Sequence, residues 1–139
     1  MTKGELFKRL HKVEDIDTAL RCVQMRIEKL EGCLQGLAIR YDTDKVQTSP
    51  KDAVAEVMCD LEGLLKKQAR LRIAMTRAVA DVANLIDRVD DKKMSLVMHY
   101  RYMACLPWRE IADKMGYAES HIFKLHGAAI GKILQDDSK

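Results

Sequence analysis

Residues 108–125 read WREIADKMGYAESHIFKL, and the spacing of their residues predicts the structure of the C-terminal part of the chain. A helix-turn-helix needs apolar residues that lock two helices together, a small residue where they cross, and a glycine at a bend with positive φ. Ala112 is the small residue and Gly116 is the bend. The apolar positions are Ile111, Met115, Tyr117, Ile122 and Leu125. The spacing predicts two short helices joined at Gly116, which is typical of a binding protein rather than of an enzyme.

The composition predicts a helical protein with a charged surface. Of the 139 residues, 47% are hydrophobic, 5% aromatic and 32% charged. The only prolines, Pro50 and Pro107, leave long stretches without a helix breaker. No apolar run reaches the about 18 residues of a membrane-spanning helix, and the N-terminal sequence MTKGELFKRL has no apolar signal core. We therefore expect a cytoplasmic protein with no membrane partner.

Two heptad seams precede the C-terminal stretch. In each, residues recur in alternating steps of three and four, which predicts a long helix packed along one face. The first seam is Val13, Ile16, Leu20, Val23, Ile27, Leu30, Leu34, Leu37 and Tyr41, and Leu6 and Leu10 continue it upstream through a slip in register. The second is Val54, Val57, Leu61, Leu64, Gln68, Leu71, Met75, Ala78, Val82, Leu85 and Val89. Its one polar member, Gln68, either fixes register or lies at a partly wet crossing.

The segment between the seams, residues 42–51, reads DTDKVQTSPK and predicts a loop. Ser49 is suited to cap the second helix and Pro50 to be its first residue. The two helices have matched lengths, so residues 1–89 are predicted to form an antiparallel helical hairpin. Two helices bury only one seam, and further apolar residues widen the second stripe. These residues, Met58, Leu65, Val79 and Ile86, favour a homodimer through the hairpin.

Residues 90–139 are predicted to form a separate three-helix unit, so the expected fold is all-α. Asp90 and Asp91 indicate the start of a helix over about 92–105, because acids favour the positive end of the helix dipole. Pro107 opens the next helix, and the last runs from about Ala118 to Leu134. The first of these helices should direct Met94, Leu96, Val97, Tyr100 and Met103 to the core, and the last Ile122, Leu125, Ala129 and Ile133.

The exposed face of the last helix is the predicted DNA-binding surface. The early residues of the second helix of a helix-turn-helix reach base edges in the major groove. Here they are Glu119, Ser120, His121, Phe123 and Lys124. Phosphate contacts are predicted from Arg101, Arg109, Lys114 and Lys132. The net charge is only +3, which argues against tight independent binding. A three-helix scaffold that binds protein is the alternative.

The sequence gives little indication of catalysis or metal binding. There is no nucleophile–base pair, phosphate loop or carboxylate dyad, so we expect no enzyme, no catalytic residue and no cofactor. Cys22, Cys33, Cys59 and Cys105 form no closely spaced pair, which favours small buried hydrophobes over metal ligands. His126 is expected to be half-buried with a hydrogen-bond partner. The basic run Lys66, Lys67, Arg70, Arg72 and Arg77 is either a solvated face or an RNA-binding one.

Residues 101–134, RYMACLPWREIADKMGYAESHIFKLHGAAIGKIL, resemble region four of sigma-70-type initiation factors, whose helix-turn-helix reads the −35 promoter element. The whole chain is similar to a family of small phage and prophage proteins of Gram-positive bacteria. In that family a long helical hairpin with a loop like DKVQTSP carries a sigma-like unit. The matching residues are Arg101, Tyr102, Trp108, Ile111, Ala112, Gly116, Tyr117, His126 and Ala129. The resemblance implies double-stranded DNA as a partner, control of late phage genes, and contact with RNA polymerase.

The chain departs from the sigma pattern at several positions. Ala118 stands where sigma regions have serine, Leu125 where they often have arginine, and Cys105 where they often have glycine. The sigma regions that bind core polymerase and melt DNA are absent, so the chain is not a complete sigma factor. The hypothesis is a sequence-specific DNA-binding phage transcriptional regulator. The alternative is a phage assembly or packaging factor that works through the hairpin.

Overall fold

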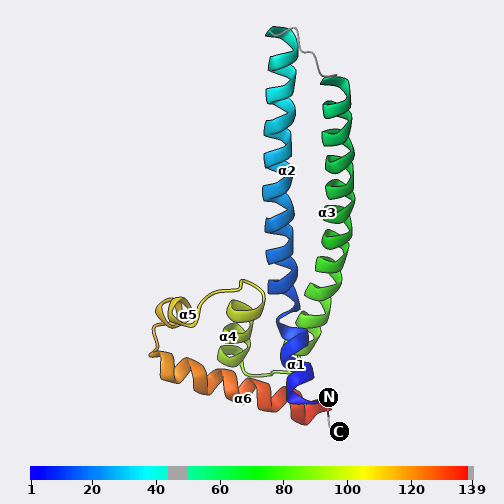
Figure 1. Cartoon of the computed structure of the whole chain (residues 1–139). Coiled ribbons are helices and arrows are strands. Elements are labelled where there is room, and N and C mark those ends of the chain that lie inside the picture. Colours follow the sequence, from blue (N-terminus) through cyan, green and yellow to red (C-terminus); the bar gives the residue numbers. More distant parts are fainter. Residues whose placement is uncertain (44–49, 138–139) are drawn as a thin grey trace. The chain divides into compact units, whose positions relative to one another are not determined.

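The computed structural model describes residues 1–43 and 50–137, and these residues form helices without any strand (Figure 1). The prediction of an all-α protein is confirmed. In chain order the helices are α1 (Lys3–Leu10), α2 (Lys12–Thr43), α3 (Pro50–Ile86), α4 (Lys92–Tyr102), α5 (Trp108–Met115) and α6 (Glu119–Asp137). The predicted cap Ser49 and most of the predicted loop 42–51 lie outside the described residues, as does the side chain of Tyr41.

Contacts divide the chain into two compact units. The terminal unit consists of Met1–Ile16 and Met75–Lys139, and the long-helix unit of Asp17–Ala74. The boundary predicted from the sequence lies between residues 89 and 90. The terminal unit groups α1, the start of α2 and the last turns of α3 with α4, α5 and α6.

The long-helix unit consists of two helical segments, from α2 and α3, that lie side by side in opposite directions (Figure 1). Its core is Val23, Ile27, Leu61 and Leu64, with Leu30, Leu34, Val57 and Leu71 packed against it. All of these residues belong to the two predicted seams. Gln68 is only 8% exposed, and its side-chain amide donates a hydrogen bond to Gln24 Oε1 at 2.9 Å. A side chain of α2 therefore supplies a hydrogen-bond partner for this polar seam residue.

The terminal unit begins with a helix that the sequence did not separate from α2. α1 starts in a capping box between Thr2 and Glu5 and ends at Leu10, and α2 starts at Lys12. The register slip predicted near Val13 is therefore a break between two helices. Arg9 binds Asp81 through two hydrogen bonds, and this guanidinium lowers the pKa of the Asp81 carboxyl. The buried residues of α1, the start of α2 and the end of α3 and its exit are Leu6, Leu10, Val13, Ile16, Ala78, Val82, Leu85, Ile86 and Val89.

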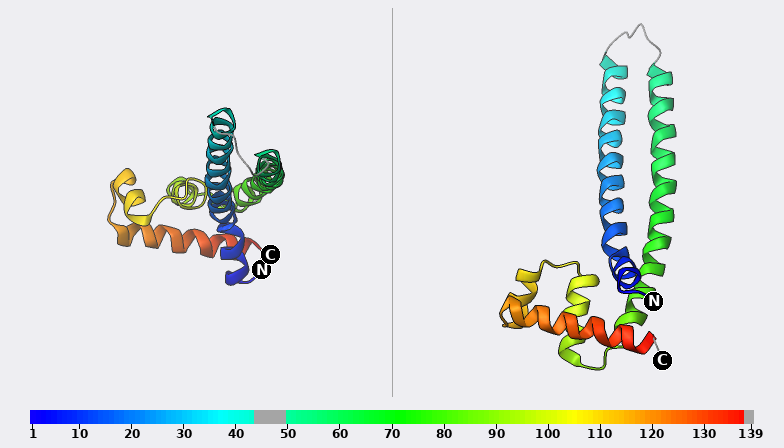
Figure 2. Two further views of the ribbon diagram at one scale, coloured as in Figure 1. Left: turned by 45° about the horizontal axis from the view of Figure 1, so that its top comes forward. Right: turned by 60° about the horizontal axis from the view of Figure 1, so that its bottom comes forward.

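Helices α4, α5 and α6 lie next to one another in the same unit (Figures 1 and 2). As predicted, Asp91 caps α4, accepting a hydrogen bond from the Met94 N–H at 3.0 Å. Pro107 precedes α5, and Gly116 ends it with φ +71°. The core is Val97, Ile111, Ala112 and Ile122, surrounded by Tyr100, Leu106, Trp108, Met115, Tyr117 and Leu125.

The expected core of α4 needs one correction. Leu96 is 42% exposed, whereas Met98 and Tyr102 are buried beside Val97. Consecutive helix residues point about 100° apart, so the stripe through Val97, Met98 and Tyr102 leaves Leu96 on the solvent side. Among the described residues, no helix combines the length and the apolar character needed to cross a membrane.

Candidate nucleic-acid interface

The connection between α5 and α6 is a tight bend. α5 ends with Gly116 in the left-handed conformation, its backbone N–H donating to the Ala112 carbonyl. The Tyr117 N–H donates to the same oxygen at 3.1 Å. Glycine is the residue for which this φ carries no steric cost. Ala118 precedes α6, and its carbonyl accepts from the His121 and Ile122 N–H groups at 3.0 and 3.2 Å. Its methyl side chain cannot accept a hydrogen bond from the first N–H groups of α6, as a serine cap would.

The first two turns of α6 present the predicted base-contacting residues to solvent. Glu119, Ser120, His121, Phe123 and Lys124 are all exposed. Ile122 lies among them and is fully buried. It anchors this end of α6 to the core together with Leu125, while the residues of the outer face stay accessible.

The predicted phosphate contacts fall into two groups. Arg109 and Lys114 on α5 and Lys132 on α6 are exposed. Arg101 is partly buried: its guanidinium lies 4.6 Å from the centre of the Trp108 ring and donates to the Leu106 carbonyl at 3.0 Å. Arg101 therefore holds the connection between α4 and α5, and its guanidinium is less available to a ligand than the other three cations.

Sequence reasoning missed Lys93, which the fold brings to the start of α6. Its ammonium lies 5.5 Å from the centre of the Tyr117 ring, and a hydrogen bond to Tyr117 raises the pKa of Lys93. The Tyr117 ring in turn meets the edge of His121, with ring centres 4.7 Å apart. Lys93 lies 24 residues before Tyr117 in the chain, so no local spacing could have linked them.

Phe123 is an aromatic side chain on the exposed part of α6. It is 48% exposed, and its ring meets Trp108 edge to face at 5.3 Å between centres. Trp108 also meets His126 at 4.7 Å. These contacts fix the orientation of Phe123 while leaving about half of its surface open, which suits a side chain that packs against an apolar group of a ligand.

His126 and Tyr102 form a part-buried hydrogen bond of 2.7 Å behind this surface. Burial raises the pKa of Tyr102 to about 12 and lowers the pKa of His126 to about 4. At neutral pH the imidazole is therefore uncharged, and its Nε2 shares this hydrogen bond with the Tyr102 hydroxyl. Phe7 of α1 lies 6.0 Å from the His126 ring. The expectation of a half-buried, hydrogen-bonded His126 is confirmed, and its role is to join α1, α4 and α6.

The charges around the bend are mixed. The exposed cations Lys93, Arg109, Lys114 and Lys124 share the surface of α4, α5 and α6 with the exposed carboxylates of Glu110, Asp113 and Glu119. A surface of this kind can contact a few phosphates but cannot supply the strong field of a highly basic protein. Specific base contacts would have to contribute much of any affinity for DNA.

The cysteine prediction was wrong for three of the four residues. Cys22, Cys33 and Cys59 are exposed and Cys105 is partly buried, all as free thiols. The three exposed cysteines lie off the two seams, where α2 and α3 have no further helix of this unit to cover them. In the part of the chain that the structure describes, no group of three or more His, Cys, Asp or Glu side chains could hold a metal ion.

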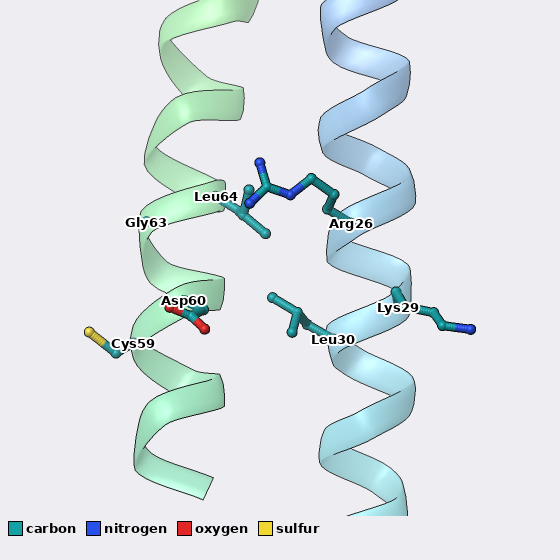
Figure 3. A pocket seen from close by; sticks show the side chains of 7 residues that line it. All are labelled: Arg26, Lys29, Leu30, Cys59, Asp60, Gly63 and Leu64. Atoms are coloured by element: carbon teal, nitrogen blue, oxygen red, sulfur yellow. The ribbon is translucent and has the colours of Figure 1, made fainter. Parts of the chain in front are cut away.

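The long-helix unit contains a shallow groove of about 510 Å³ (Figure 3). Leu30 and Leu64 project into it from α2 and α3, whereas Cys59 and Lys29 project away. Arg26 and Asp60 contribute one charge of each sign. The groove therefore lacks the convergent polar groups of a catalytic or small-molecule site.

Comparisons of the chain with protein-family models, with curated proteins and with solved structures found no match.

Proposed function

We propose that this chain is a sequence-specific DNA-binding protein in which α5 and α6 act as a helix-turn-helix. The observation that carries the proposal is the left-handed bend at Gly116. It joins α5 and α6 over a shared core and leaves five side chains of the first two turns of α6 exposed. In helix-turn-helix proteins these turns of the second helix enter the major groove.

The exposed side chains suit distinct roles in this proposal. Ser120, His121 and Lys124 donate hydrogen bonds to base edges or phosphates, and Glu119 accepts from a cytosine amino group. Phe123 packs against a thymine methyl group. Arg109, Lys114, Lys93 and Lys132 contact phosphates and fix the orientation of the unit. Arg101 positions Trp108, and through it Phe123.

The long-helix unit supplies the second part of the proposal. Its two segments act as a helical hairpin that joins two copies of the chain, so that each copy reads one half-site of a DNA duplex. The resemblance to sigma region four and to small phage proteins adds a biological context: a cytoplasmic regulator of late phage genes that also touches RNA polymerase.

The test is selection of bound sequences from a pool of random DNA duplexes, followed by fluorescence anisotropy on the selected duplex. We expect enrichment of a defined motif. With about four phosphate contacts, affinity should fall roughly a hundredfold between about 50 and 200 mM salt. The double variant His121→Ala/Lys124→Ala should abolish specific binding and leave the helical circular dichroism signal unchanged.

The matched control is Lys92→Ala/His99→Ala, which removes the same two residue types from exposed positions of α4. It should bind like the unchanged protein. Failure to enrich any sequence refutes the DNA-binding proposal, and unaltered binding by the α6 variant refutes the assignment of α6 to the groove.

A second candidate function is a phage assembly or packaging factor that works through the hairpin. It is favoured by the large apolar side chains that the long-helix unit exposes, such as Met25, Met58, Leu65 and Ile73. In this case the chain associates with protein, and the selection experiment returns no motif.

A further inference from the structure

Helix α3 carries a second apolar stripe beside its buried seam. Within the long-helix unit the positions that directly follow the seam residues also recur in steps of three and four. They are Ala55, Met58, Glu62, Leu65, Ala69 and Arg72, here called the second stripe, and all are exposed. Met58 and Leu65 are each 52% exposed. Two adjacent heptad seams on one helix are typical of a helix that packs against two neighbours.

The matching positions of α2 show that this pattern is particular to α3. Up to Gln35 they are Arg21, Gln24, Glu28, Glu31 and Gln35, all polar or charged, and the position after Leu37 is an alanine. Gln24 hydrogen-bonds to Gln68 and to Glu28. α2 therefore presents a solvated face at the positions where α3 presents methionine, leucine and alanine, and α3 is the helix with room for a further partner.

Charge is segregated along the same part of α3. Its exposed acids, Asp52, Glu56, Asp60 and Glu62, all precede its exposed bases Lys66, Lys67, Arg70 and Arg72. Lys51 is the one base in the first half. Two copies of this helix packed in parallel would place acid against acid and base against base. Packed in opposite directions, Glu62 of each copy can instead lie beside Arg72 of the other.

One antiparallel register suits the second stripe especially well. With the two-fold axis beside residue 67, Leu65 of each copy packs on Ala69 of the other, and Glu62 faces Arg72. Glu62 makes an ion pair with Lys66 at 3.2 Å, and both side chains are exposed. This pair contributes little to stability and leaves the carboxylate available to a second cation. Alanine at position 69 lets the two helices approach closely.

We propose that a second copy of this chain packs against the second stripe of α3 in the antiparallel direction. The interface is isologous, with the same residues contributed by both copies. This interface specifies the face and the orientation by which the hairpin of the proposed function joins two copies. The residues involved all belong to α3, so a test of this interface is independent of DNA binding.

The first test is sedimentation velocity of the full chain over a concentration series. We expect a reversible dimer. Leu65→Glu should raise its dissociation constant by roughly a hundredfold or more, because a carboxylate would be placed in the apolar centre. The control Glu31→Arg changes a charge at a matching position of α2 and should leave association unchanged. A monomer at every concentration, or a dimer that is insensitive to Leu65→Glu, overturns the proposal.

A charge-swap experiment tests the orientation. Glu62→Arg and Arg72→Glu should each weaken the homodimer roughly tenfold or more, because like charges then meet twice at the interface. An equimolar mixture of the two variants should restore the dimer, since every pair in the mixed dimer has opposite charges. Glu62 and Arg72 are about 15 Å apart along one helix, so rescue reports contact between copies. Loss of association in the mixture, with both variants still helical by circular dichroism, overturns the antiparallel register.

Discussion

The cluster formed by α4, α5 and α6 and the seam between α2 and α3 bury their apolar residues to different degrees. In the first, Val97, Ile111 and Ile122 are fully buried among three short helices. In the second, Val23, Ile27, Leu61 and Leu64 keep between 2% and 8% of their surface exposed, and they pack within only two helical segments. This small difference accompanies the different number of helices around each core. Two long helices leave flanks open, and a further copy can cover them.

The largest effect that tests this comparison is expected from shortening core side chains. Ile122→Ala should lower the free energy of unfolding by about 3–5 kcal/mol, because fully surrounded atoms are lost and a cavity remains. Leu64→Ala should cost only about 2 kcal/mol, since Leu64 already lines the open groove of the long-helix unit. Urea unfolding followed by circular dichroism measures both changes. Equal costs would contradict the interpretation that the seam is the more open of the two cores.

The next largest effect is a pH dependence of the free energy of unfolding, which His126 should confer on the terminal unit. Residues 17–74 contain no histidine, whereas burial lowers the pKa of His126 from its usual 6.5 to about 4. As the pH falls from 6.5 towards 4, the unfolded chain takes up a proton that the folded chain does not. The free energy of unfolding should therefore fall over this window, by about 2 kcal/mol, and should lose nothing further through His126 below it.

Thermal unfolding at pH 7 and pH 5 measures this loss. His126→Gln should reduce the difference between the two pH values, and the exposed control His99→Gln should leave it as it is. A pH dependence that survives His126→Gln would assign the effect to other groups.

The smallest effect is expected at the polar residue of the seam. Gln68→Leu should raise the free energy of unfolding by about 1 kcal/mol, because an apolar residue fits a seam position better and Gln24 remains accessible to water. Gln24→Ala should lower it by about 1 kcal/mol, because the buried amide of Gln68 then lacks its acceptor. Both are measured by urea unfolding. A loss of stability in Gln68→Leu would indicate that the hydrogen bond outweighs the apolar contact.

Local signals allowed much of the fold to be predicted. Asp91, Pro107 and Gly116 each mark a helix end through their own backbone or side-chain chemistry, and all three lie where a helix starts or stops. The two seams likewise predicted the core of the long-helix unit. The exposed positions of α6 followed from the placement of Ile122 on the buried stripe. These features depend on residues close together in the sequence.

Features that depend on distant residues were not predictable in the same way. The break after Leu10 places Phe7 next to His126, and the contact of Lys93 with Tyr117 depends on how α4 and α6 cross. Arg101 was expected to reach a phosphate, yet it lies over Trp108, because the turn between α4 and α5 folds back on it. Periodicity indicates which face of a helix is buried but not which residue of another helix it meets.

The backbone of Cys105 adopts a conformation that is unfavourable for a residue with a side chain. It has φ +57°, the only positive value for a non-glycine residue in the described part of the chain. A β-carbon in this conformation costs about 1 kcal/mol relative to glycine. The linker ahead of α5 thus holds the Cys105 side chain in a conformation that opposes it, and a glycine at this position would relax the chain path.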